Sequence, residues 1–138
     1  MAEERFELIE HTADIGLVAY GEDLGGAFMN AAYGMSSIMA ELEDVGEAES
    51  RLVEAEEDDW EGLLFEWLNQ LIYLFDVAKL IFRRFEVLEF DEYHLKVNCY
   101  GEKYDPARHH FKTGIKSATY HQLEVDTEKN QVQVIFDI

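Results

Sequence analysis

The first candidate for chemistry in this sequence is an aspartate near the start of the chain, paired with the acidic end of the chain. The segment His11–Gly16, His-Thr-Ala-Asp-Ile-Gly, interrupts a strand-like pattern and contains Asp14. The sequence ends in Asp137 and Ile138, which offer a carboxylate and a backbone or terminal oxygen one residue apart. Hard cations such as Ca²⁺ and Mg²⁺ prefer oxygen ligands of this kind. We therefore predict that Asp14, Asp137 and Ile138 meet and form a small divalent-cation site.

The histidines are weaker candidates for ligands. His11 lies three residues before Asp14, and His121 lies in a strand-like run, so we interpret both as hydrogen-bonding residues that support a site. His109 and His110 are adjacent, and adjacent rings converge on one zinc ion less easily than an i, i+4 helical pair. No serine lies in a nucleophile-elbow pattern, so the sequence predicts no catalytic nucleophile.

Charge is distributed unevenly along the chain. The formal net charge is -19, which argues against general binding to a phosphate backbone, because such binding needs clustered lysine and arginine. The exception is the segment of residues 103–116, which contains four basic residues and only one acidic residue, Asp105. The basic residues of this segment are Lys103, Arg108, Lys112 and Lys116. We interpret most of the acidic excess as a solvated surface and the basic segment as a candidate interaction site.

Composition indicates one globular domain over residues 1–138. The 48% of hydrophobic residues suffices for a core without covalent staples. Cys99 is the only cysteine, which favours a reducing, cytoplasmic setting, and its alternating spacing with Leu95 and Val97 predicts a buried strand thiol. The N-terminus lacks the pattern of a signal peptide, and no apolar run approaches the length of a membrane span.

Two periodicities predict the elements that must position these residues. Apolar residues at spacings of three and four predict helices over residues 24–42 and 60–75, capped by Asp23 and Asp58. Gly101 to Lys116 is predicted to be a long loop. Alternating patterns predict strands over residues 5–10, 15–20, 50–56, 80–90, 93–100, 117–125 and 131–138.

The order of these elements favours an α+β fold: a mostly antiparallel sheet or sheets with two amphipathic helices in a single compact domain. Strands 80–90 and 93–100 form a predicted hairpin, and strands 117–125 and 131–138 form a second one. Strict alternation over residues 80–90 puts Phe82 and Phe90 on one face and Phe85 on the other.

Three segments together resemble the archease family. They are His-Thr-Ala-Asp-Ile-Gly at 11–16, Gly-Ile-Lys-Ser-Ala-Thr-Tyr-His at 114–121, and Phe-Asp-Ile at 136–138. The resemblance extends over the whole chain, including its length and the order of its elements. One departure is Ser117, where many family members carry alanine.

The resemblance implies an accessory protein of the tRNA-splicing RNA ligase of the RtcB type, without catalytic activity of its own. Such a protein stimulates guanylylation of the ligase and sustains multiple turnovers. The family's divalent-cation site corresponds to Asp14, Asp137 and Ile138, and its functionally important lysine corresponds to Lys116. The expected ion is Ca²⁺, with Mg²⁺ or Mn²⁺ as alternatives. Neither stable direct nucleic-acid binding nor membrane association is expected.

Two other functions stay open from the sequence. The resemblance also implies chaperone-like modulation of a tRNA methyltransferase, in which case activity depends on surface area and not on Lys116. The other alternative is a small metal-dependent hydrolase that uses Asp14, His11, His121 and Asp137. It has less support because no water-activating base is evident.

Overall fold

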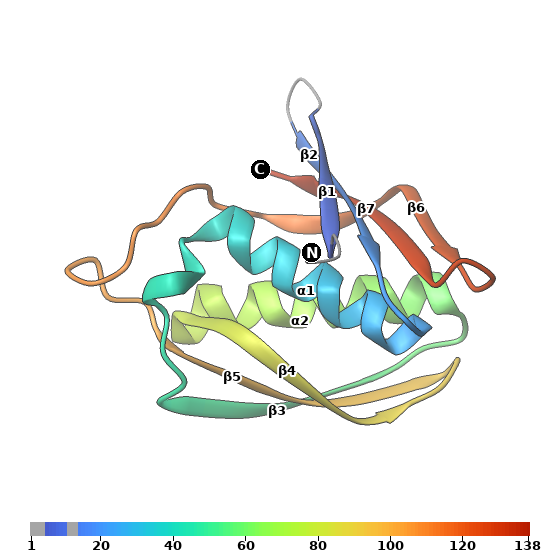
Figure 1. The fold of residues 1–138 in the computed structure, drawn as a ribbon, viewed down its shortest axis with the longest axis horizontal. Coiled ribbons are helices and arrows are strands. Elements are labelled where there is room, and N and C mark those ends of the chain that lie inside the picture. Colours follow the sequence, from blue (N-terminus) through green and yellow to red (C-terminus); the bar gives the residue numbers. More distant parts are fainter. Residues whose placement is uncertain (1–4, 11–13) are drawn as a thin grey trace.

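Two amphipathic helices lie between two antiparallel sheets in the computed structural model, which describes residues 5–10 and 14–138 (Figure 1). One sheet has the strand order β1-β2-β7-β6 and the other has the order β3-β5-β4. The elements are β1 (Phe6–Glu10), β2 (Asp14–Tyr20), α1 (Leu24–Met39), the 3-10 turn η1 (Leu42–Asp44), β3 (Glu49–Glu56), α2 (Trp60–Ala78), β4 (Leu80–Phe90), β5 (His94–Lys103), β6 (Ser117–Asp126) and β7 (Gln131–Asp137). The predicted α+β class, the element order and both hairpins are confirmed.

Each helix starts at an aspartate whose side chain accepts a backbone hydrogen bond. Asp23 Oδ1 accepts from the Gly26 N–H at 2.7 Å, as predicted. The cap of α2 is Asp59 and not the predicted Asp58, and it accepts from the Gly62 N–H at 2.7 Å. Asp59 occupies the capping position because its extended backbone directs the carboxylate at the free N–H groups of the first turn.

The core lies where the helices meet both sheets. Trp67 of α2 is fully buried, and its Nε1 donates to the Phe28 carbonyl oxygen of α1 at 3.1 Å. Fully buried side chains from β2, β7 and β5 complete the same cluster: Leu17, Phe136 and Val97. Each large apolar side chain buried here contributes about 1.5–3 kcal/mol of transfer free energy.

Several predicted boundaries and one predicted face differ from the structure, and α2 continues beyond the predicted end at residue 75 to Ala78. Helix α1 ends at Met39, and Leu42 lies in the 3-10 turn, where it is still buried. Strand β5 extends to Lys103, so the loop begins at Tyr104. The face assigned to Phe85 was wrong: it joins the core beside Phe82, because β4 contains a β-bulge between these two residues.

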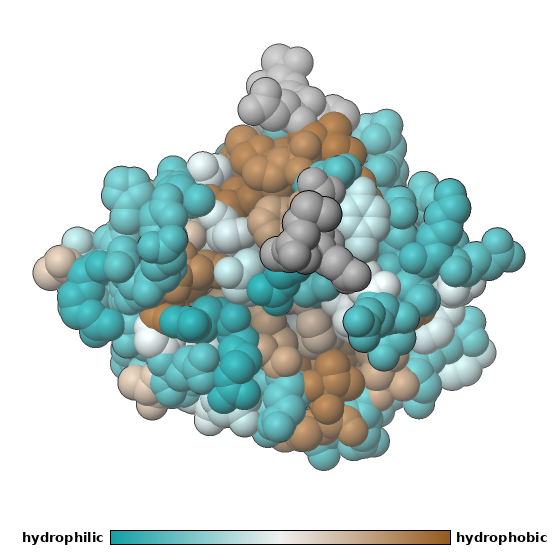
Figure 2. Space-filling view, in the orientation of Figure 1, coloured by the Kyte–Doolittle hydropathy of each residue, from teal (hydrophilic) through white to brown (hydrophobic). Residues whose placement is uncertain are grey.

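No helix among the described residues is both long and apolar enough to cross a lipid bilayer. Figure 2 shows a largely hydrophilic surface on one face, interrupted by separate hydrophobic patches.

Candidate functional site

Strand pairing brings Asp14 and Asp137 together although they are far apart in the sequence. In the antiparallel β2–β7 ladder, Asp14 is the direct partner of Asp137. Directly opposed residues of such a pair have Cβ atoms about 4.5–5.5 Å apart and side chains on one face. Asp137 is exposed and Asp14 is half-buried. Two carboxylates in this position repel, and a cation between them relieves the repulsion.

The loop of residues 104–116, which carries most of the basic segment, reaches the same end of the β1-β2-β7-β6 sheet from the other side of β7. The Lys116 N–H donates to the Asp137 carbonyl oxygen at 2.8 Å. Ser117, the next residue, is the direct partner of Asp137 in the β6–β7 ladder. Lys116 is exposed, whereas Ile115 before it is buried and anchors the loop to the core. A carboxylate pair and a lysine from three separate segments therefore lie on neighbouring strand ends.

The donor atoms at this edge fit a hard divalent cation in type. The carboxylates of Asp14 and Asp137 supply oxygen, and Ile138 follows directly after Asp137 with main-chain oxygens. Within residues 5–10 and 14–138, no group of three or more His, Cys, Asp or Glu side chains has the geometry of a metal site. Further ligands for an ion would therefore be main-chain, hydroxyl or water oxygens, which Ca²⁺ accepts. Cation binding here stays a prediction.

The loop that carries Lys116 is held firmly against both helices. The Glu41 N–H donates to the His110 carbonyl at 3.0 Å, and the Lys112 N–H donates to the Met39 carbonyl at 2.7 Å. Phe111 stacks on Phe75 of α2, with ring centroids 5.7 Å apart. These contacts hold residues 110–112 of the loop at the C-terminal end of α1. They therefore restrict the path that the chain takes from there to Lys116.

A buried carboxylate anchors the start of this loop. Glu102 Oε2 accepts from the Gly46 N–H at 2.8 Å, from His109 Nε2 at 2.7 Å and from the Arg108 guanidinium. His109 Nδ1 accepts from the Asp105 N–H at 2.8 Å, so Nε2 carries the proton that it donates to Glu102. The hydrogen bond from Gly46 lowers the pKa of Glu102 below its ordinary value, against the effect of burial, and His109 and Arg108 lower it further.

Of the two predicted supporting residues, the structure describes only His121, and it lies away from this edge. His121 is exposed in an irregular part of β6, four residues or about 13 Å along the strand from Ser117. Its supporting role stays a prediction. His11 lies outside the described residues, as do Thr12 and Ala13 of the same motif. Glu102 was not predicted as the partner of His109, and the only signal for this contact in the sequence is the position of the histidine in the loop.

The predicted thiol burial is confirmed. Cys99 is fully buried in β5, and desolvation raises its pKa to about 12. A thiol with this pKa stays protonated at neutral pH and does not act as a nucleophile.

Comparison with known proteins supports one family over nearly the whole chain. The model of the "Archease protein family (MTH1598/TM1083)" matches residues 6–138. The protein archease of Methanosarcina mazei is 40% identical over an alignment that covers 98% of this chain and 97% of the relative. The protein archease of Pyrococcus abyssi is also 40% identical, over 89% of each chain.

Two solved structures share the fold. The solution structure of protein 1598 from Methanobacterium thermoautotrophicum has a TM-score of 0.77 at 30% identity, covering 97% of this chain and 99% of that chain. A crystal structure from Thermotoga maritima, described as an archease and possible chaperone (TM1083), has a TM-score of 0.59 at 24% identity, covering 100% of this chain and 98% of that chain. At that identity, the second likeness supports the fold alone.

Proposed function

The chain belongs to the archease family, and from that premise we propose that it is an accessory activator of an RtcB-type tRNA-splicing RNA ligase. In this proposal the protein has no catalytic residues of its own. It promotes guanylylation of the ligase and its multiple turnover, and it acts in the cytoplasm.

The observation that carries the proposal is the convergence of Asp14, Asp137 and Lys116 on neighbouring strand ends. The two carboxylates and a main-chain oxygen of Ile138 would hold a divalent cation, with Ca²⁺ expected and Mg²⁺ or Mn²⁺ as alternatives. A bound cation supplies positive charge at a tip that otherwise presents carboxylates. Lys116 is exposed beside it, so its ammonium is available to a carboxylate or phosphate of the partner.

The acidity of the rest of the chain supports docking on a protein and not on bare RNA. A net charge of -19 repels a phosphate backbone and is complementary to the basic surface of an RNA-binding enzyme. In this arrangement the ligase holds the RNA, and the accessory protein contacts the ligase.

The decisive experiment measures guanylylation of a purified RtcB-type ligase with and without this protein. We expect Asp14→Ala, Asp137→Ala and Lys116→Ala each to abolish stimulation while cooperative melting is retained. Matched controls are Asp76→Ala on the exposed side of α2 and Lys129→Ala in the β6–β7 turn, which we expect to stimulate like the wild type. Full stimulation by the three site variants would refute the proposal.

The cation can be tested separately by calorimetric titration with Ca²⁺, Mg²⁺ and Mn²⁺. Removing one of two ligand carboxylates in Asp14→Asn should weaken binding by about 100-fold or more, since loss of even an outer partner costs roughly 10- to 100-fold. Lys116→Ala should leave the affinity unchanged or slightly raised. Wild-type affinity in Asp14→Asn would remove this residue from the ligand set.

The chaperone-like alternative, modulation of a tRNA methyltransferase, has support in a set of exposed apolar side chains on α2, β4 and β6: Tyr73, Val77, Leu88 and Tyr120. It predicts that protection of the methyltransferase from aggregation survives Lys116→Ala and is lost on Tyr73→Ser with Val77→Ser. The hydrolase alternative predicts Asp14-dependent phosphoester turnover without any ligase.

A further inference from the structure

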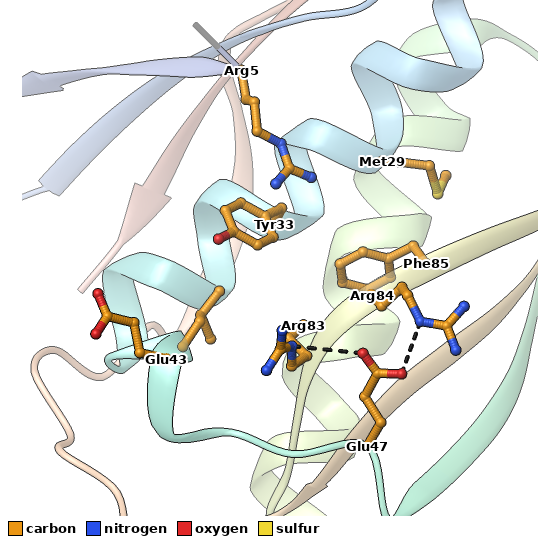
Figure 3. A pocket seen from close by; sticks show the side chains of 9 residues that line it. Arg5, Met29, Tyr33, Glu43, Glu47, Arg83, Arg84 and Phe85 are labelled. Carbon is orange, nitrogen blue, oxygen red and sulfur yellow. Dashed lines mark hydrogen bonds and ion pairs between the residues drawn. The ribbon is translucent and has the colours of Figure 1, made fainter. Parts of the chain in front are cut away.

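A cavity of about 370 Å³ lies at the other end of β2 from the carboxylate pair (Figure 3). Strand β2 runs from Asp14 to Tyr20, about 20 Å, and the Tyr20 N–H donates to the carbonyl of Arg5, which lines the cavity. Arg83 and Arg84 of β4 line it as well. Three arginines around one cavity are an unusual concentration of positive charge in a chain with a net charge of -19.

A β-bulge directs the two neighbouring arginines to the same side of the sheet. Phe82 pairs with Gly101 and Arg84 with Tyr100, so Arg83 is the extra residue of the bulge. In a regular strand, consecutive side chains point to opposite faces. Here Arg84 Nε lies 2.8 Å and Arg83 Nε 3.6 Å from the two carboxylate oxygens of Glu47, which places both guanidinium groups on one face.

The third arginine is held on the opposite wall of the cavity by an aromatic ring. The Arg5 guanidinium carbon lies 3.7 Å from the centroid of the Tyr33 ring, and Arg5 Nε donates to Asn30 Oδ1 at 3.0 Å. Figure 3 shows Tyr33 and Phe85 between Arg5 and the β4 arginines, with Met29 to one side. The cavity thus has arginines on two opposite walls, and apolar and aromatic side chains line the space beside them.

Donor groups are left over after these contacts are counted. Arg83 Nη1 donates to the Val45 carbonyl oxygen at 2.8 Å. In the part of the chain that the structure describes, neither Nη2 of Arg83 nor the Nη atoms of Arg5 form a hydrogen bond. Fixed guanidinium planes with free N–H groups suit the oxygens of a phosphate, which binds arginine in a bidentate manner.

We propose that this cavity binds the phosphate group of a small phosphorylated ligand through Arg5 and Arg83, with the rest of the ligand against Tyr33 and Phe85. Glu47 fixes the orientation of Arg83 and Arg84 and does not fill the site, since both its oxygens are engaged by these two side chains. The volume is at the lower end of the range for small-molecule sites and accommodates a mononucleotide-sized ligand.

The acidic remainder of the chain does not prevent this binding. The Debye length is about 8 Å at physiological ionic strength, so distant carboxylates are screened, whereas contacts inside a partly enclosed cavity are screened much less. The lining itself has three arginines against two glutamates, Glu43 and Glu47. This inference is independent of the ligase proposal, because it uses none of the residues at the Asp14–Asp137 edge.

Calorimetric or NMR titration at constant ionic strength tests the proposal with four probes: inorganic phosphate, adenosine monophosphate, adenosine and acetate. We expect saturable binding of inorganic phosphate, of adenosine monophosphate or of both. The tighter ligand of the two shows whether the site prefers free phosphate or the phosphate group of a larger molecule. Adenosine and acetate should bind much more weakly. Equal binding of acetate would overturn the assignment to phosphate.

Variants locate the binding. Arg83→Gln and, on the opposite wall, Arg5→Gln should each weaken binding by at least about tenfold, the loss expected for one charge-assisted hydrogen bond. Because Arg83 also bonds Val45, Arg5→Gln keeps the test valid if the first variant is unstable. The matched control is Arg51→Gln, whose side chain is 43% exposed, as against 42% for Arg83, and is likewise paired with a glutamate. The proposal would be overturned if neither inorganic phosphate nor adenosine monophosphate bound saturably, or if Arg51→Gln weakened binding as much as the two cavity variants.

Discussion

Between β2 and β7 of the first sheet, the pairing runs from Asp14 opposite Asp137 to Tyr20 opposite Gln131 without a shift in register. In the second sheet, β4 shifts against β5 twice, once at Arg83 and once near Leu88. In the first sheet, regular pairing up to the strand ends brings together Asp14 and Asp137, which are more than a hundred positions apart in the sequence. In the second sheet, each shift in register changes which face of the sheet the following side chains of β4 point to.

The difference shows two ways in which a sheet can assemble polar groups. A regular ladder brings directly opposed residues together up to the strand ends, as it does for Asp14 and Asp137. A bulge places chemistry beside the middle of a strand, but it requires a partner strand that tolerates the distortion. Gly101 provides that tolerance, because a Cβ atom at this position would lie 1.9 Å from the Ile81 carbonyl oxygen.

The largest expected effect comes from adding one methyl group to an inner strand of each sheet. Gly101→Ala places its Cβ against the backbone of β4, which cannot rotate away, so we expect a loss of about 3 kcal/mol or more in unfolding free energy. Gly16→Ala in β2 meets the flexible tip of Ile135 at 2.9 Å, and also Ile9 Cβ at 3.0 Å and the Ile9 carbonyl oxygen at 3.2 Å, so it should cost less than Gly101→Ala, about 1–3 kcal/mol. Urea denaturation measures both, and equal losses would contradict the contrast between the two sheets.

A smaller loss of stability is expected from Glu102 in β5 of the second sheet, which anchors the loop that leads to β6 of the first sheet. Glu102→Gln removes the charge that accepts from Gly46, His109 and Arg108, and we expect a loss of about 1–3 kcal/mol near neutral pH. Because the folded pKa of Glu102 is depressed, its stabilising contribution is present above the unfolded value of 4.5 and is lost as pH falls through the folded pKa.

Unfolding free energies of the wild type and Glu102→Gln between pH 3 and 7 test this directly. The difference between the two proteins should shrink toward acidic pH. A constant difference would mean that the carboxylate charge contributes nothing and that only the shape of the side chain matters.

The smallest expected effect concerns an exposed cross-strand pair of the second sheet. His94 Nε2 lies 2.9 Å from Glu54, and this hydrogen bond raises the pKa of His94 and lowers that of Glu54. The raised histidine pKa contributes stability below its unfolded value of 6.5, and this is lost as pH rises through the folded pKa. The depressed glutamate pKa contributes above 4.5 and is lost as pH falls.

The pair therefore stabilises most between pH 4.5 and 6.5, by the small amount typical of exposed pairs. Melting temperatures of wild type and His94→Gln across pH 4 to 8 should differ most inside this window. An identical pH profile for both proteins would show that the pair adds no stability.

The sequence was sufficient for the features that follow from local periodicity. Helix stripes such as that of Trp67, Leu68 and Leu71 depend on spacing alone, and their burial is confirmed. The meeting of Asp14 with Asp137 was a hypothesis that the spacing alone did not establish, because it depends on the register in which β2 pairs with β7. The face of Phe85 was wrong because an inserted residue changes the alternation, and no local pattern at Arg83 distinguishes a bulge from a regular strand.

Other parts of the site depend on contacts between remote segments. Glu102 binds His109 seven residues later and Gly46 on another element, and neither distance corresponds to a regular period. Ser117 faces Asp137 only because β6 pairs with β7 in one particular register. These partners depend on tertiary packing, which periodicity does not encode.

The two tryptophans give the molecule its own optical probes. Trp67 is fully buried between the helices with its indole N–H bonded to Phe28, whereas Trp60 is partly exposed and stacks on Phe90 of β4 with ring centroids 5.4 Å apart. Emission from Trp67 should be shifted to short wavelength and report on the shared core. Replacing one indole at a time with phenylalanine would let fluorescence distinguish loosening at the end of β4 from collapse of the whole fold, without any attached dye.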